Sequence, residues 1–153
     1  MKKYKSFGAL ARKLAKVAAE LPVTYADSMQ ISATLVKSKA KESIGHYQDG
    51  WEKLAVSTVL DKLDSGYAAV ALPGGDGGDN PLLRTGAMRD SITDESNALE
   101  FIVGSPSEIL VYQETGTSRI PPRPVLAPAL YKSVPEILQI TGAAIEKRLA
   151  GES

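Results

Sequence analysis

Two long stretches of helical periodicity, one at each end of the sequence, enclose a middle that is interrupted by Gly and Pro. In residues 6–21 the apolar side chains recur at steps of three and four, which places them on one helix face: Phe7, Leu10, Leu14, Val17 and Leu21. Ser6 stands at the expected N-cap. Pro22 predicts the end of this helix, because the residue before a proline avoids helical geometry. We therefore expect an N-terminal helical arm whose apolar face is covered by its own domain or by another subunit.

A second helix is predicted from Thr24, as its N-cap, to about Ile44. Its apolar residues again follow steps of three and four, and they are Met29, Ala33, Val36, Ala40 and Ile44. Gly45 is placed to end the helix. Its flanks are basic because of Lys37, Lys39 and Lys41.

The C-terminal stretch, residues 125–149, predicts a long helix. Pro128 fits its first turn, whereas Pro135 should kink or split it. The expected apolar side is made of Leu126, Leu130, Val134, Ile137, Leu138, Thr141, Ile145 and Leu149.

Shorter elements are predicted between these helices. Residues 45–51 read as a turn-rich link. Residues 52–64 read as a short helix that buries Leu54, Val56, Val59, Leu60 and Leu63, and 67–72 as a short strand. Residues 73–81 hold four glycines but neither the Gly-Lys-Ser/Thr of a phosphate loop nor the closing Glu of a calcium loop, so a flexible surface loop is expected.

The run from Leu82 to Ile92 predicts a tight corner. A short helix should begin at Thr85 or Gly86, with the apolar residues facing the core together: Leu82, Leu83, Met88 and Ile92. Residues 98–104 form the best strand pattern in the chain.

A short helix and a stiff loop should follow that strand. Ser107 is a candidate N-cap for a helix over 108–115, which would turn Ile109, Tyr112 and Val111 inward and end at Gly116. The loop 117–124 contains three prolines, which fix the backbone around Arg119 and Arg123.

The sequence lacks the residue groupings that catalysis or metal binding requires. It has no Cys, one His (His46) and no Gly-x-Ser-x-Gly around Ser91. Asp90, Asp94 and Glu95 cluster, but we interpret them as solvated carboxylates. No stretch of about 18 apolar residues occurs, so no membrane span is expected. We expect no enzyme, no cofactor and no metal site.

Charge is balanced overall but unevenly distributed. Residues 1–50 hold nine Lys or Arg against four Asp or Glu, and residues 51–118 hold four against eleven. Opposite charges in separate segments could attract each other between copies of the chain, or each could be a solvated surface. A rival hypothesis is a nucleic-acid-binding module that uses the basic N-terminal helices. It predicts DNA affinity that falls steeply with salt.

The ordered motifs of the middle resemble those of the tailed-phage virion morphogenesis proteins, a group that includes tail-completion and head–tail joining proteins. The resemblance covers roughly residues 45–130. The matching pieces are Trp51-Glu52-Lys53-Leu54, Ser57-Thr58, Lys62, Leu82 to Ile92, Val103-Gly104, Val111 to Thr117 and Pro121 to Leu126. The chain departs from the pattern at Val125, where family members often carry Phe.

This resemblance implies an α+β fold with a small antiparallel β-sheet flanked by helices. With the periodic ends, it implies a helical region over 1–46 and a tail-completion-like domain over 47–153, together one compact domain. It also implies a homo-oligomeric ring, commonly of six copies, in the virion at the head–tail junction or tail end. The implied partners are the chain itself, an adjacent neck or connector protein, a tail-tube or tail-terminator protein and, non-specifically, DNA in the channel. Assembly would take place in the host cytoplasm.

Four arginines are the candidate contacts between subunits, because the planar guanidinium offers five donors: Arg84, Arg89, Arg119 and Arg123. The alternative is that one or two of them tie together loops of their own chain. On the first interpretation, Arg123→Ala should block joining of heads to tails while the monomer stays folded. Subunits would join through the N-terminal helices and the sheet, and loops 73–81 and 117–124 would reach an adjacent ring or the DNA channel.

Overall fold

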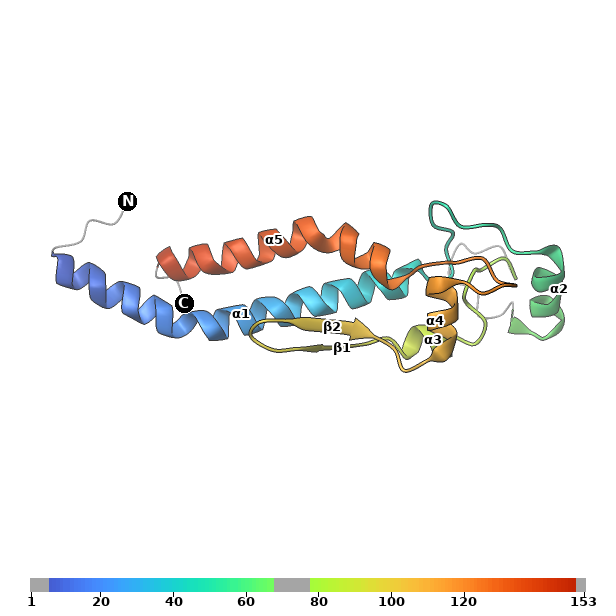
Figure 1. Cartoon of the computed structure of the whole chain (residues 1–153), viewed down its shortest axis with the longest axis horizontal. Helices are drawn as coiled ribbons and strands as arrows, with labels where there is room; N and C mark the ends of the chain where they lie inside the picture. The colour runs from blue at the N-terminus through green and yellow to red at the C-terminus, as the bar shows by residue number, and fades with distance from the viewer. Residues whose placement is uncertain (1–5, 68–77, 151–153) are drawn as a thin grey trace.

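Two long antiparallel helices form the body of the molecule in the computed structural model, which describes residues 6–67 and 78–150. Helix α1 (Phe7–Ser43) and helix α5 (Leu126–Ala150) lie side by side along the long axis (Figure 1). A hairpin of two strands lies against α1, and short helices gather at one end. The predicted α+β class is therefore confirmed, with a long helix at each end of the sequence and a small antiparallel sheet between them.

The predicted break at Pro22 was wrong, because α1 continues through it as one helix. Ser6 is the N-cap, as expected, and its Oγ accepts from the amide of Ala9 at 3.2 Å. Pro22 removes a single backbone donor. Packing continues on both sides of it, since Val17 and Thr24 are both buried. Thr24 is accordingly not a cap; its hydroxyl donates to the carbonyl of Glu20 at 3.2 Å inside the helix.

Part of the buried surface of α1 is made of small hydroxyl residues. Thr24, Ser28 and Ser32 follow each other at steps of four, on the helix side that also carries Glu20, which binds Arg148 of α5. Ser28 and Ser32 donate to the carbonyls one turn earlier, at 2.9 and 2.7 Å. Ser133 on α5 does the same to Ala129 at 2.7 Å. Thr24, Ser28 and Ser32 form a hydroxyl seam on α1, and Thr24 Oγ1 also accepts from Arg148 Nε of α5 at 3.1 Å. Because each of these buried hydroxyls is hydrogen-bonded, burying them costs little.

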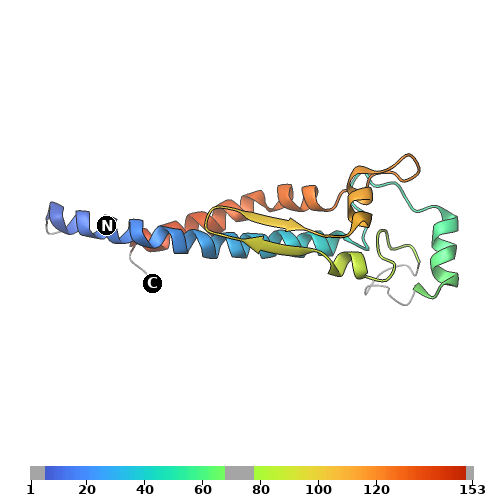
Figure 2. The ribbon, with the colours of Figure 1, turned by 60° about the horizontal axis from the view of Figure 1, so that its bottom comes forward.

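The sequence predicted only one of the two strands of this sheet, and the first of them was not foreseen. Strand β1 (Thr93–Ser96) pairs with β2 (Phe101–Gly104) in antiparallel register from Thr93 opposite Gly104 to Ser96 opposite Phe101. The hairpin lies along α1 in both views (Figures 1 and 2). In the turn, the side-chain oxygen of Asn97 accepts from the amides of Leu99 at 2.8 Å and Glu100 at 3.1 Å. The predicted strand over 98–104 is confirmed in its second half.

Asp94 attaches the hairpin to α1. Its carboxylate accepts from Lys37 Nζ at 2.5 Å, Thr34 Oγ1 at 3.2 Å and Gln30 Nε2 at 3.4 Å. The interpretation of Asp94 as a solvated carboxylate was therefore wrong. A β-strand turns alternate side chains to the same face, and the pattern of β1 turns Asp94 toward the helix.

The core lies where the helical pair meets the short elements. Gly86 begins α3 (Ala87–Asp90) at φ +85°, a left-handed conformation that favours glycine, as the sequence predicted. Leu83, Met88 and Ile92 turn inward as expected and Leu82 is half-buried. The core cluster is Val36, Ala40, Ile44, Leu83, Met88, Ile92, Leu110, Val125 and Ala129. Residues of the ranges 1–46 and 47–153 thus share one core.

The two short helices bury other residues than predicted. Helix α2 (Val56–Asp64) lies at the far end of the molecule (Figure 1), and its residues Val56, Leu60 and Leu63 are exposed. Helix α4 (Glu108–Thr115) ends at Gly116 as predicted but buries Leu110, leaving Ile109, Val111 and Tyr112 exposed. Ser107 precedes α4 without a side-chain cap bond. Apart from Tyr67, the predicted strand over 67–72 lies outside the described residues, as does most of the loop over 73–81.

Helix α5 buries a narrower face than its periodicity indicated. Ala129 and Ser133 are its buried residues, while Leu130, Val134, Leu138 and Leu149 remain exposed. One neighbouring helix can cover only one stripe of α5, which explains the difference. Pro135 lies inside the helix without splitting it, and the axis of α5 changes direction along its course (Figure 1).

Truncating Ile92 tests the position of the core. Ile92 is 1% exposed and Ile102 on β2 is 64% exposed. We expect Ile92→Ala to lower the free energy of unfolding by about 3 kcal/mol, from lost burial and the cavity left behind. The matched Ile102→Ala should cost no more than about 1 kcal/mol. Urea unfolding followed by circular dichroism measures both, and equal losses would contradict this core.

The pairing of Asp94 predicts a pH dependence of stability. The hydrogen bond from Lys37 holds the pKa of Asp94 below its usual value of 3.8. A carboxylate with a lowered folded pKa stabilises the protein above its unfolded pKa, and this contribution is lost as pH falls through the folded pKa. At neutral pH the free energy of unfolding should therefore be higher for wild type than for Asp94→Asn. This difference in free energy should shrink as the pH falls below the usual Asp pKa of 3.8. A difference that does not change with pH would show that the pair does not stabilise the fold.

Candidate functional site

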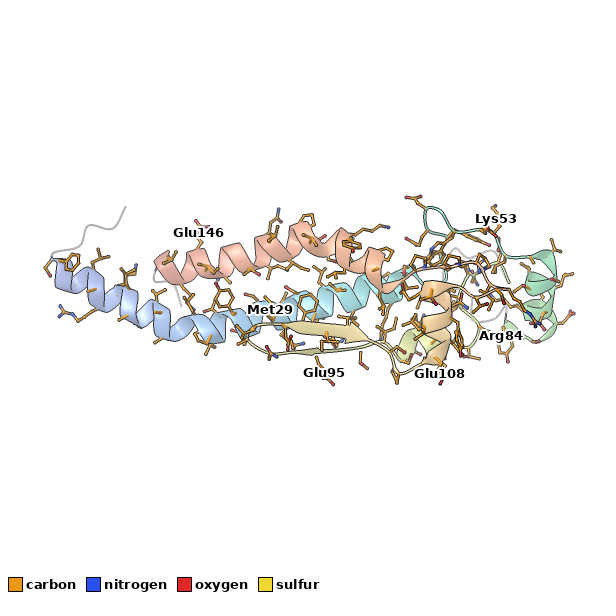
Figure 3. The ribbon with its side chains drawn as sticks, viewed as in Figure 1. Met29, Lys53, Arg84, Glu95, Glu108 and Glu146 are labelled. Carbon is orange, nitrogen blue, oxygen red and sulfur yellow. The ribbon has the colours of Figure 1, made fainter. Side chains whose placement is uncertain are left out.

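A cleft of about 760 Å³ opens at the end of the molecule that carries α2. Its walls come from residues 52–62, the corner at 82–88, the exposed side of α4 and the proline loop 119–123. Lys53 and Arg84 mark this end in Figure 3. The sequence motifs of the middle thus converge on one hollow, although they lie far apart along the chain.

The side chains around this hollow are cationic and apolar. Among the described residues that line it, five carry positive charge and Glu52 alone carries negative charge; the cations are Lys53, Lys62, Arg84, Arg119 and Arg123. Apolar surface comes from residues such as Leu54, Met88, Ile109 and Ile120. We call this site the cationic cleft. It suits an anionic ligand that also carries apolar groups.

Lys62 was named among the motif residues, but the sequence did not predict its burial or its place in the cleft. It is only 6% exposed, and its Nζ donates to the backbone carbonyl of Asn80. Burial is the main cause that lowers the pKa of Lys62. The negative charge of Asp79 raises this pKa, whereas the positive charges of Arg84 and Arg123 lower it further. In the sequence, Lys62 lies in a short predicted helix, and a lysine in such a helix is ordinarily solvated.

Arg123 is nearly buried, with 6% of its surface exposed. Its guanidinium donates to the carbonyl of Glu52 at 2.9 Å, and its amide donates to the carbonyl of Gln113 at 2.6 Å. It therefore ties the proline loop to the segment before α2 within its own chain. Among the described residues, neither Arg123 Nε nor Gln113 Oε1 has a hydrogen-bond partner, although both atoms are buried.

The other three predicted arginines differ in position. Arg84 lines the cleft, binds Asp61 at 2.7 Å and stacks 4.8 Å from the ring centre of Tyr67. Arg119 lines the cleft from the exposed part of the proline loop. Arg89 stays outside it and pairs with the neighbouring Asp90 at 3.2 Å. The cleft therefore brings together three of the four predicted arginines.

Glu114 fixes the proline loop from its other side. Its carboxylate accepts from the amides of Val125, at 2.7 Å, and Leu126, at the start of α5. A carboxylate at a helix N-terminus satisfies free amides and meets the positive end of the helix dipole. Thr117 Oγ1 accepts from the amides of Arg119 and Ile120 at 3.2 and 3.1 Å. These bonds explain the Glu-Thr-Gly-Thr run as a structural clamp on the loop.

Within residues 6–50, the described part of the basic N-terminal region, lysines of α1 are already engaged in ion pairs. Lys37 is paired with Asp94, and Lys39 is paired with Glu136 at 2.5 Å. Across the described ranges 6–67 and 78–150, no group of His, Cys, Asp or Glu is arranged to hold a metal ion. In the same ranges, no helix has the length and apolar content needed to cross a membrane.

Comparison of the chain with protein-family models, curated proteins and solved structures returned no match.

The buried position of Arg123 predicts a stability effect that its neighbour should not share. Arg123→Ala removes a buried donor and the packing of its stem, so we expect a loss of about 2 kcal/mol in unfolding free energy. Arg119→Ala, on the exposed part of the same loop, should change it by no more than about 0.5 kcal/mol. Chemical denaturation of both variants measures the difference. A fully stable Arg123→Ala would restore the expectation that its role lies only between subunits.

Proposed function

We propose that the protein is a structural assembly protein of a tailed phage, which forms a homo-oligomeric ring at the head–tail junction or tail end. The observation that carries this proposal is the amount of large apolar side chain left in water on several separate elements. Phe7 on α1 is 86% exposed, and Tyr131 on α5 is 74% exposed. Large exposed apolar surface is typical of proteins that bury it against partners.

The exposed residues lie along the whole molecule. They include Phe7 and Leu14 near the start of α1, Leu99 and Ile102 on the hairpin, and Leu130, Tyr131, Val134 and Leu138 on α5. A subunit that contacts neighbours on more than one side, as in a ring, has a use for such a distribution.

The sequence supports the same proposal independently. The ordered pieces from Trp51 to Leu126 resemble the virion morphogenesis group, and several of them surround the cationic cleft. In this proposal the ring binds a neck or connector protein on one face and a tail-tube or tail-terminator protein on the other. The action of the protein is mechanical, and its bonds to neighbours hold the two parts of the particle together.

The nucleic-acid-binding alternative has less support. Lys37 and Lys39, two of the nine basic residues in 1–50 that motivated it, form ion pairs with Asp94 and Glu136. Paired lysines contribute less to binding a phosphate backbone, because their charge is already compensated.

Self-association of the purified protein tests the proposal. Light scattering over a range of concentrations should give a mass that rises to a closed oligomer, and electron microscopy should show rings. DNA affinity at physiological salt should be weak. A protein that stays monomeric at all concentrations and binds DNA with a steep salt dependence would overturn the proposal in favour of the alternative.

A further inference from the structure

We propose that the cationic cleft is the docking site for the tip of the β1–β2 hairpin of a second copy of this chain. The hairpin tip, residues 95–100, has the sequence Glu-Ser-Asn-Ala-Leu-Glu. This inference rests on the self-assembly proposed above and specifies its contact.

The hairpin tip presents a ligand of the kind that the cleft suits. Leu99 is 89% exposed, the highest exposure among the large apolar side chains of the described residues. Glu95 and Glu100 flank it, and no basic residue lies in the tip. Lys53 and Arg119 are exposed cations of the cleft, and apolar side chains line it as well, so charge and hydrophobic surface are complementary on the two sides.

Hydrogen bonds also hold the hairpin tip in one conformation before it binds. Asn97 accepts from the amides of Leu99 and Glu100, and its side-chain nitrogen donates to Glu100 Oε1 at 3.2 Å. Ser96 donates to Gln30 of α1 at 2.9 Å, which holds the base of the turn on the helix. A turn already held in one conformation loses little entropy when it binds.

The tip cannot reach the cleft of its own chain. The hairpin lies against α1, and its turn points along the long axis away from the α2 end (Figures 1 and 2). Glu95 and Arg84 are well separated along that axis in Figure 3. A tip-to-cleft contact therefore joins two copies head to tail, and such a contact closes into a ring or continues as a chain.

Two variants with different defects test this contact by mixing. The tip variant Leu99→Asp keeps its cleft intact, and the cleft variant Ile109→Asp/Arg119→Glu keeps its tip intact. All three substituted residues are exposed, which leaves the fold undisturbed; thermal unfolding checks this. Each variant alone should self-associate at least about thirtyfold more weakly than wild type, as expected when an interface hot spot is lost.

Mixed in equal amounts, the two variants should form a complex with the mass of two chains and no larger species, because one intact tip meets one intact cleft. The control Val111→Asp changes α4 outside the cleft and should assemble as wild type does; Val111 is 56% exposed against 58% for Ile109. Analytical ultracentrifugation measures all of these masses.

The outcomes separate the two proposals. A wild type that assembles while either variant alone assembles equally well would overturn the tip-to-cleft contact and leave the proposed function standing. Two monomeric variants that fail to combine on mixing would overturn it as well, since the interface would then be of another kind. A wild type that remains monomeric would overturn the proposed function itself.

Discussion

The antiparallel contact of α1 with α5 brings the two ends of the sequence side by side, and the hairpin and the proline loop are each tied to one of these helices. The hairpin is positioned through Asp94 on the opposite flank of α1, and the cleft is closed by the loop that Glu114 clamps at the start of α5. The hairpin and the proline loop, which are distant in the sequence, are therefore both positioned by this pair of helices. This arrangement explains how the described residues, with a sheet of two strands, hold the hairpin tip and the cleft at separate places along the long axis.

Local signals predicted the elements whose form is set locally. The cap at Ser6, the tight backbone at Gly86 and the helix ends at Gly45 and Gly116 are properties of single residues, and all were foreseen. Pro22 was misread because its local cost is outweighed by packing on both sides, which only the tertiary structure supplies. Strand β1 escaped notice because Thr-Asp-Glu-Ser has no apolar alternation; its place comes from pairing with β2 and from Asp94.

The cleft was only partly visible in the sequence. Arg84, Arg119 and Arg123 were selected as arginines in stiff or tight segments, but nothing in the chain order places them around one hollow. The buried Lys62 could not be inferred at all, since its environment depends on Asn80 and on the neighbouring cations. Arg123 shows the same limit, because the sequence left open whether each arginine contacts another subunit or ties loops of its own chain, and only the fold shows the bond from Arg123 to Glu52.

The hydroxyl seam has a consequence for how the two helices are aligned lengthwise. Thr24, Ser28 and Ser32 are small and repeat at every turn of α1, so these side chains alone do not mark one lengthwise position for a neighbouring helix. The position is marked by contacts between particular residues. Arg148 of α5 donates to Thr24 at 3.1 Å and pairs with Glu20, and Lys39 pairs with Glu136 nearer the other end. Ala129 of α5 adds to these contacts, because it belongs to the same core cluster as Val36 and Ala40 of α1. The lengthwise alignment of the two helices therefore depends on a few specific contacts and not on the repeated small hydroxyls.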